Sequence, residues 1–248
     1  MKNSAYLERR RRVGEFLDEK GIDVFLVEDT EESRSPSLRY LSGHPNDALL
    51  FLCRGGRSVL VPWDVPLART RADVDEILPY NDFGRRPVIA LLGFLEKEGY
   101  RGSRRPPRIA LDRRFSFPAA SRAVREVTRE FPGAEIVCSE DGPDAFIEEL
   151  RLVKDAEEIR RLRAAAGILN TLVDGMERAL RNGGLRSEIE AALYIESECR
   201  RLGAEGTSFD TIAAGPDRSF GIHAFPNYGP GPLDRKSTRL NSSHGKLS

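Results

Sequence analysis

The sequence predicts an α/β protein with a mixed sheet in its first half and two long amphipathic helices opening its second half. Short apolar runs of strand length alternate with helical patterns through residues 22–138. A Gly-Gly turn joins two of these runs, which predicts a hairpin and therefore an antiparallel pair within the sheet. With 248 residues, the chain is long enough for two ordinary domains.

The first half reads as one α/β domain, which we expect to span residues 1–142. Its opening helix is amphipathic, directs Leu7 and Val13 inward, and ends at Gly21 in a left-handed cap. In chain order we expect a helix over 6–20, strands over 22–27, 48–53 and 58–61, a helix over 65–72, a strand over 76–78, a helix over 87–99, a strand over 108–111, a helix over 118–130 and a strand over 134–138. A polar loop, 28–37, separates the first two strands.

Two helices in the second half are marked by capping signals. Asp155 with Glu158, and Ser187 with Glu190, have the spacing of a capping box. Each pair precedes apolar residues at intervals of three and four. In the first helix this inward stripe consists of Ala156, Ile159, Leu162, Ala166, Leu169, Val173, Met176 and Leu180. Two helices followed by strand material cannot bury both stripes, so we expect another segment to cover them.

Composition excludes several classes of protein. Lys plus Arg and Asp plus Glu number 39 each, which argues against a nucleic-acid or anionic-membrane binder. The arginine clusters at 9–12, 85–86 and 104–105 are interpreted as solvated faces. No secretory signal and no apolar run of about 20 residues occurs. The three cysteines are widely spaced, which favours buried free thiols and a cytoplasmic location.

Few side chains have a context that suggests chemistry. His44 is expected to be structural or merely exposed, and Trp63, the only tryptophan, is expected to pack. The stretch Thr207–Pro226, TSFDTIAAGPDRSFGIHAFP, passes a Gly-Pro turn and delivers His223 from an apolar run. On this local pattern alone, a core or loop histidine is the more frequent interpretation.

Three stretches together resemble one enzyme family. LRLVKDAEEIRRLRAAAGI (150–168) is similar to the segment that opens the catalytic domain of the creatinase, prolidase and aminopeptidase P metallopeptidases. The stretch 207–226 resembles their histidine motif, and YLSGHPNDALLFL (40–52) resembles their N-terminal domain. The resemblance covers residues 6–233. It implies a creatinase-type N-terminal domain, and then the incomplete first part of a pita-bread α+β catalytic domain over residues 143–233.

The resemblance also implies a reaction. Such enzymes hold two divalent metals (Mn, Co or Zn), whose shared hydroxide attacks the peptide bond before a proline. His223 matches a histidine that binds substrate and assists proton handling. The metal ligands, two aspartates, a histidine and two glutamates, all follow that histidine. This chain has only Asp234 and His244 there, so we expect it to bind no metals and to be catalytically incomplete.

The last residues do not continue the family pattern. DRKSTRLNSSH (234–244) is polar, rich in serine and aperiodic, as in a disordered tail. All eleven residues also equal the translation of a widely used short-read sequencing adapter. We therefore expect residues 234–248 to be a non-native tail joined to an interrupted gene, and Asp234 and His244 to have no role in a site.

The functional hypothesis is an N-terminal fragment of a cytoplasmic Xaa-Pro peptidase, of the aminopeptidase P or prolidase type. Its implied partners are a proline-containing peptide substrate and a second copy in a homodimer, with no nucleic acid and no membrane. Two alternatives stay open. One is a fragment of a creatinase-like hydrolase that cleaves a non-peptide C–N bond. The other is a non-catalytic relative of the same fold that binds peptides or proteins.

Overall fold

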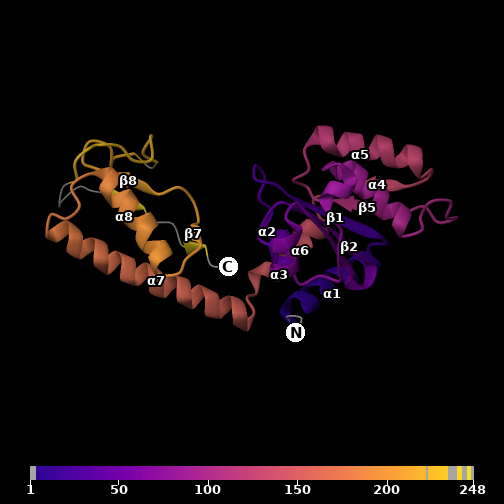
Figure 1. Cartoon of the computed structure of the whole chain (residues 1–248), viewed down its shortest axis with the longest axis horizontal. Helices are drawn as coiled ribbons and strands as arrows, with labels where there is room; N and C mark the ends of the chain where they lie inside the picture. Colours follow the sequence, from indigo (N-terminus) through magenta and orange to yellow (C-terminus); the bar gives the residue numbers. More distant parts are fainter. Residues whose placement is uncertain (1–3, 222, 234–238, 242–244, 247–248) are drawn as a thin grey trace. The chain divides into compact units, whose positions relative to one another are not determined.

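The structure is a computed structural model that describes residues 4–221, 223–233, 239–241 and 245–246. The chain divides into two compact units, Met1–Val153 and Lys154–Ser248 (Figure 1). The predicted boundary at residue 142 falls at the start of helix α6 (Pro143–Leu152), and α6 packs on the first unit.

The first unit is built on a six-stranded mixed sheet in the order β4-β3-β2-β1-β5-β6. The strands are β1 (Val24–Asp29), β2 (Ala48–Cys53), β3 (Ser58–Pro62), β4 (Glu76–Ile77), β5 (Arg108–Leu111) and β6 (Glu135–Val137). β1, β2 and β3 pair antiparallel, whereas β3–β4, β1–β5 and β5–β6 pair parallel. The predicted mixed sheet and its hairpin are confirmed.

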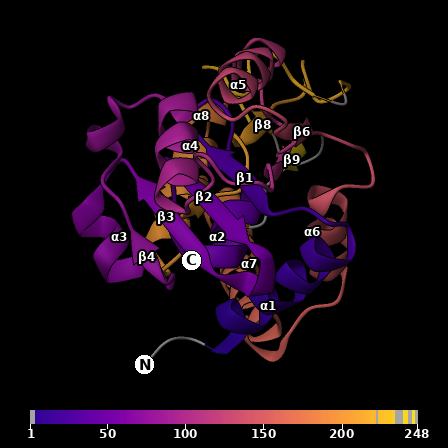
Figure 2. The ribbon, with the colours of Figure 1, turned by 90° about the vertical axis from the view of Figure 1, so that its right-hand side faces the viewer.

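Helices cover both faces of this sheet. On one face lie α4 (Pro87–Lys97) and α5 (Phe117–Glu130), side by side in Figure 2. The other face is covered by α1 (Ser4–Glu19), α2 (Pro36–Ser42), α3 (Val65–Arg71) and α6. Alternation along β1 serves both layers, because Val24 and Leu26 pack on the first face while Phe25 and Val27 pack on the second.

Most predicted elements of this unit occur within a few residues of their expected ends. Gly21 follows the end of α1 and has a φ of +66°, which is the predicted left-handed conformation. Leu7 is 50% exposed, so its predicted inward orientation is wrong, whereas Val13 is fully buried. Two helices, α2 and α6, were not predicted. Both begin with proline at the first position, after segments whose polar character suggested loops.

The first arginine cluster is a solvated face only at Arg11 and Arg12, which are exposed, whereas Arg9 and Arg10 turn toward the protein. Arg10 is fully buried, and its guanidinium donates to the Leu41 carbonyl oxygen at 2.9 Å and to Asp73 Oδ1 at 3.1 Å. The Arg9 guanidinium lies 4.1 Å from the centre of the Tyr40 ring. These contacts compensate the loss of hydration, because a buried charge is tolerated only when it is paired and hydrogen-bonded.

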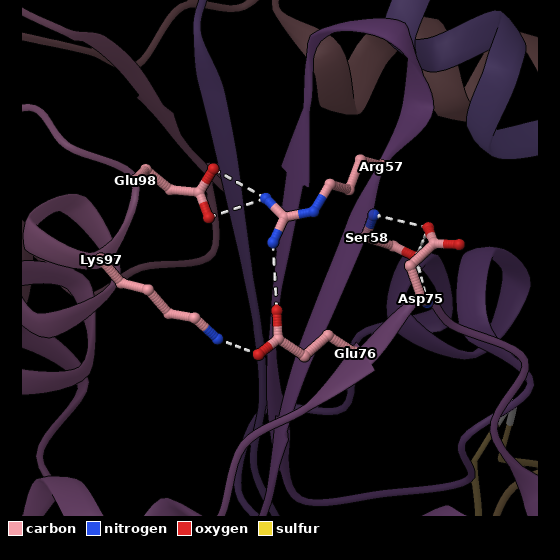
Figure 3. A network of polar contacts seen from close by, with 6 residues as sticks. All are labelled: Arg57, Ser58, Asp75, Glu76, Lys97 and Glu98. Carbon is pink, nitrogen blue, oxygen red and sulfur yellow. Dashed lines mark hydrogen bonds and ion pairs between the residues drawn. The ribbon is translucent and has the colours of Figure 1, made fainter.

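Ion pairs fasten the edge strand β4 to the end of α4 (Figure 3). Arg57 Nη1 donates to both carboxylate oxygens of Glu98 at 2.7 Å, and Arg57 Nη2 to Glu76 at 3.0 Å. Lys97 also pairs with Glu76. Because these side chains are partly solvated, each pair is expected to contribute only about 0–1 kcal/mol.

The cysteines are all free, but only Cys199 is buried; Cys53 is half-buried and Cys138 is exposed, contrary to the expectation of three buried thiols. Within the described residues, every helix is too short or too polar to cross a bilayer.

The second unit begins with the two predicted helices, α7 (Ala156–Arg181) and α8 (Glu188–Arg201), and both capping boxes are confirmed. Four short strands follow and pair antiparallel, β8 with β9 and β7 with β10. They are β7 (Gly206–Thr207), β8 (Ile212–Ala214), β9 (Arg239–Asn241) and β10 (Gly245–Lys246). Asp234 and His244 lie outside the described residues, and the origin of the tail stays a prediction.

Most of the apolar stripe on α7 is uncovered. Leu162 is 53% exposed and Val173 is 49% exposed. Met176, in contrast, is 5% exposed, and together with Leu172 it packs against α8. The predicted inward orientation is therefore wrong over most of the helix. The expectation that this unit cannot bury the stripe by itself is confirmed for the described residues.

The difference in burial predicts unequal resistance to proteases. Limited trypsin digestion should cleave sites after Leu150 about tenfold faster than sites in residues 9–150, because the second unit has small core clusters and opens more readily. Mass spectrometry of the early fragments locates the cuts. Equal cleavage rates in the two units would contradict this expectation.

A buried carboxyl pair joins β5 to α6. Asp112 and Asp144 are 2% and 6% exposed and hydrogen-bond each other. Asp112 Oδ1 accepts from the Arg114 amide at 2.8 Å, and Asp144 Oδ2 from the Arg113 amide at 3.1 Å. Burial and the neighbouring Asp112 charge raise the pKa of Asp144 to about 7. One carboxyl therefore keeps its proton well above the usual range of aspartate.

This pair predicts a stability that falls with rising pH. An unfolded aspartate has a pKa of about 3.9, so the folded state binds the extra proton between about pH 4 and 7. The stabilisation is complete below this window and is lost as the pH rises through 7. Relative to Asp144→Asn, the wild-type free energy of unfolding should decrease by about 1–3 kcal/mol from pH 5 to pH 8.

Urea titrations at both pH values measure this difference. Asp141→Asn, at an exposed carboxylate three residues earlier, is the matched control and should follow the wild type. An identical pH dependence in wild type and Asp144→Asn would rule out the shared proton.

Candidate functional site

His223 lies on the loop that follows β8. Its side chain is exposed, and it makes no hydrogen bond or ion pair within the part of the chain that the structure describes. Its neighbour Ala224 is 7% exposed and packs against Ile212 and Ala214 of β8. The backbone next to His223 is therefore anchored, while the imidazole is available to a ligand.

A carboxylate that the sequence did not single out organises this loop. Glu188, the first residue of α8, is 1% exposed. Its Oε1 accepts from the Gly215 amide at 2.7 Å and from Arg218 Nε at 3.1 Å. Its Oε2 accepts from the Gly229 amide at 2.7 Å and from Arg218 Nη2 at 2.6 Å. These contacts form the Glu188–Arg218 clamp, which holds both ends of the loop that carries His223.

The clamp keeps its charge despite burial. Burial by itself raises the pKa of Glu188, but Arg218 and the amides of Gly215 and Gly229 outweigh it and hold that pKa below its usual range. Arg218 also donates to the Pro226 carbonyl oxygen at 2.7 Å. The ion pair is thus embedded in charge-assisted hydrogen bonds, the arrangement that makes a buried pair favourable.

Glycine is required where the loop meets the clamp. A Cβ atom at position 215 would lie 2.1 Å from the Pro232 carbonyl oxygen, a distance that no side chain can occupy. At Gly231 a Cβ would lie 3.2 Å from Glu188 Oε1, which is a tight contact. The glycines of this segment therefore leave room for the backbone to approach the carboxylate.

The sequence did not reveal Glu188 because its role depends on distant partners. An acidic residue is common in the first turn of a helix, because its negative charge interacts favourably with the helix dipole. Its partners lie 27 to 41 residues later. The available signal was the arginine at 218 within a segment that has glycines on both sides, and this signal has no meaning until the acceptor is known.

Apolar rings lie around the histidine in the sequence. Phe220 is 88% exposed and Phe225 94%, and Phe209 is 48% exposed. His44, the other described histidine, is in the first unit and fully buried, so its structural interpretation holds. Trp63 is 54% exposed and its ring stands edge-on to Tyr80 at 6.3 Å, so it packs against the protein only in part.

The described residues do not fit a two-metal centre. Among them, no three His, Cys, Asp or Glu side chains lie close enough to hold one metal ion. Glu188, the buried carboxylate of this region, is already occupied by Arg218 and two amides. Asp210 is exposed and stands apart from any such group. No catalytic step through metals follows from these residues.

A mixed sheet covered on both faces and followed by a helix pair is the arrangement found in the first part of the pita-bread fold. Residues 9–153 match the creatinase/prolidase N-terminal domain, and the chain belongs to that family. A segment of 94 residues is 36% identical to the putative dipeptidase YkvY of Bacillus subtilis (strain 168). This match covers 38% of the chain and 24% of the relative.

Solved structures share the fold over nearly the whole chain. They include the X-Pro aminopeptidase from Thermotoga maritima (TM-score 0.70, 21% identity, 95% of this chain and 61% of that one). The prolidase from Pyrococcus furiosus has a TM-score of 0.68 and 20% identity over 96% of this chain and 66% of that one. The Xaa-Pro dipeptidase from Bacillus anthracis has a TM-score of 0.71 and 20% identity, with 96% and 61% covered. The chain therefore spans less than two thirds of these enzymes.

The clamp predicts a specific loss of order. In Glu188→Ala, the amides of Gly215 and Gly229 lose their acceptor, and their hydrogen exchange should accelerate about tenfold or more. Exchange mass spectrometry of peptides covering residues 212–230 measures the effect. Glu198→Ala, which removes a surface ion pair with Arg201 on the same helix, is the control and should leave these peptides unchanged.

Proposed function

We propose that this chain contributes the N-terminal domain and the first wall of the active site to an Xaa-Pro peptidase of the aminopeptidase P or prolidase type. The observation that carries the proposal is the His223 loop, which the Glu188–Arg218 clamp holds while the imidazole has no partner among the described residues. Support comes from the family of residues 9–153 and from proline-peptidase structures with the same fold.

In this proposal residues 1–142 form the N-terminal domain, and residues 143–233 begin the catalytic domain. His223 holds the peptide near the bond that precedes proline, and it donates or accepts a proton there. Anchoring matters for this role, because catalysis depends on holding the reacting groups in place before the reaction. The clamp supplies it by restraining the backbone at Gly215 and Gly229.

The metals belong to the complete enzyme and not to the residues described here. Two divalent ions (Mn, Co or Zn), a proline-containing peptide, a homodimer and a cytoplasmic location are parts of the proposal. A charged two-metal site needs several oxygen or nitrogen ligands at once. The described residues supply no such group, and the proposal assigns the metal ligands to residues beyond His223 in the complete enzyme.

The chain alone is therefore expected to show no turnover. Purified protein, incubated with Mn²⁺ or Co²⁺ and an Xaa-Pro dipeptide or tripeptide, should release no more product than buffer does. An active prolidase serves as the positive control. Metal-dependent hydrolysis that disappears in His223→Ala would contradict the proposed incompleteness and would place the site within this chain.

Resequencing the locus tests the peptidase proposal itself. A reading frame that continues past residue 233 with two aspartates, a histidine and two glutamates would support it. A genuine stop after DRKSTRLNSSH and the four residues that follow would contradict it, and would favour a non-catalytic peptide-binding relative.

A further inference from the structure

An acidic cleft of about 770 Å³ lies in the first unit, where β1 ends. Its wall combines the end of β1, the start of β2, the turn after β3 and the segment from Tyr80 to Pro87. A single cation, Arg85, faces six carboxylates among the lining residues. These carboxylates are Glu28, Asp29, Glu31, Glu32, Asp47 and Asp64. The function proposed above makes no use of this cleft.

Some of these carboxylates already have partners inside the protein. Asp29 accepts from the Ser35 amide at 2.8 Å and from Arg34 at 2.8 Å. Asp64 caps α3 by accepting from the Leu67 amide at 2.9 Å. Their charges are used in holding the loops of the cleft in place.

Glu28 is different. It is half-buried, and its carboxylate has no hydrogen bond or ion pair within the described chain. Burial, together with the charge of Asp112, raises the pKa of Glu28. A partly buried carboxylate without a counter-charge is unfavourable, and a cation that enters the cleft would relieve this cost.

A second, independent observation comes from Tyr80. This side chain is 8% exposed and lines the cleft, and its hydroxyl makes no hydrogen bond with any described residue. The ring of Tyr80 is buried, while its hydroxyl is open to the cleft, since tyrosine combines an apolar body with a polar tip. Burial and the charge of Glu28 raise the pKa of Tyr80, so the hydroxyl stays protonated. It can donate to or accept from a ligand at the same place where Glu28 offers its charge.

The third feature is an aromatic surface that already binds a cation. The Arg85 guanidinium lies 4.4 Å from the centre of the Trp63 ring, and that ring stands edge-on to Tyr80 at 6.3 Å. Arg85 and Asp47 are described residues other than glycine with positive φ, +55° and +38°, and both line the cleft. Such strained backbone is often found at binding sites.

These features select one chemical class of ligand. A metal ion is disfavoured, because no three of the described carboxylates converge on one point. A planar guanidinium or an ammonium group on a carbon chain suits separated carboxylates and an aromatic face. We propose that the acidic cleft binds such an organic cation, with Glu28 as the counter-charge, Tyr80 as a hydrogen-bond partner and the part of Trp63 that Arg85 leaves exposed as the aromatic wall.

The chain carries its own reporter for this proposal. Trp63 is the only tryptophan, so fluorescence that is excited selectively at tryptophan reports on the surroundings of the cleft. The full chain is titrated with agmatine, with the capped peptide acetyl-Gly-Arg-Gly-amide, and with acetyl-Gly-citrulline-Gly-amide, which keeps the shape of arginine but carries no positive charge. At least one of the two cations should give a saturable change, and the citrulline peptide should bind about tenfold more weakly or worse.

Variants then locate the site. Glu28→Gln should weaken binding of the cation about tenfold, and Tyr80→Phe should weaken it several-fold, about twofold to fivefold. Glu140→Gln, at an exposed carboxylate of the same unit outside the cleft, should bind as the wild type does. Circular dichroism confirms that each variant is folded.

The two cations distinguish the source of the ligand. Comparable affinity for agmatine and the peptide would indicate a free amine, whereas a preference for the peptide would indicate a basic residue in a polypeptide. The absence of saturable binding by either cation would overturn the proposal. Equal binding of the citrulline peptide would also overturn it, and this comparison needs no variant. The proposal would also be overturned if folded Glu28→Gln bound the cations with the affinity of the wild type.

Discussion

Burial of the central sheet on both faces is the constraint on which the first unit depends. The first four residues of β1, Val24 to Val27, alternately enter one of two apolar layers, so this part of the strand has no face left for polar side chains. Complete burial of a valine, leucine or phenylalanine side chain contributes about 1.5–3 kcal/mol to the free energy of unfolding. The partly solvated pairs around Arg57 contribute far less each. Burial therefore decides the architecture, while the ion pairs fasten its edge.

Polar chemistry begins where this burial ends. Glu28 and Asp29 are the last residues of β1, and Asp112 directly follows β5. Their side chains leave the apolar layers but stay partly or wholly buried, so each needs a partner. Asp29 finds backbone amides and Arg34, and Asp112 shares a proton with Asp144. Glu28 has no such partner among the described residues, so its half-buried charge is not compensated inside the protein.

The second unit also contains a buried carboxylate, and its charge is compensated by groups from a distant part of the chain. Glu188 is almost fully buried, and it keeps its charge because two amides and Arg218 replace the water that it loses. The pair connects α8 to a loop that would otherwise have little apolar contact. Because the core of this unit is small, the clamp restrains the His223 loop in place of hydrophobic packing.

Local patterns in the sequence were sufficient for most elements. The hairpin follows from a Gly-Gly turn between apolar runs, and α7 and α8 follow from their capping boxes, because these signals act within a few residues. The helix α2 was missed because its seven residues are too few to show a period. His223 was found through a motif, whereas Glu188 was not, because no local pattern marks it.

The sequence by itself thus determined the class of fold, the succession of most strands and helices, and the histidine on its loop. Only the tertiary structure decided which charges are buried and which partners they have. Arg10, Asp144 and Glu188 look like surface residues in the sequence, yet all three are buried. The physical reason is that burial of a charge depends on donors and acceptors brought from distant positions, and the chain has to fold before those groups meet.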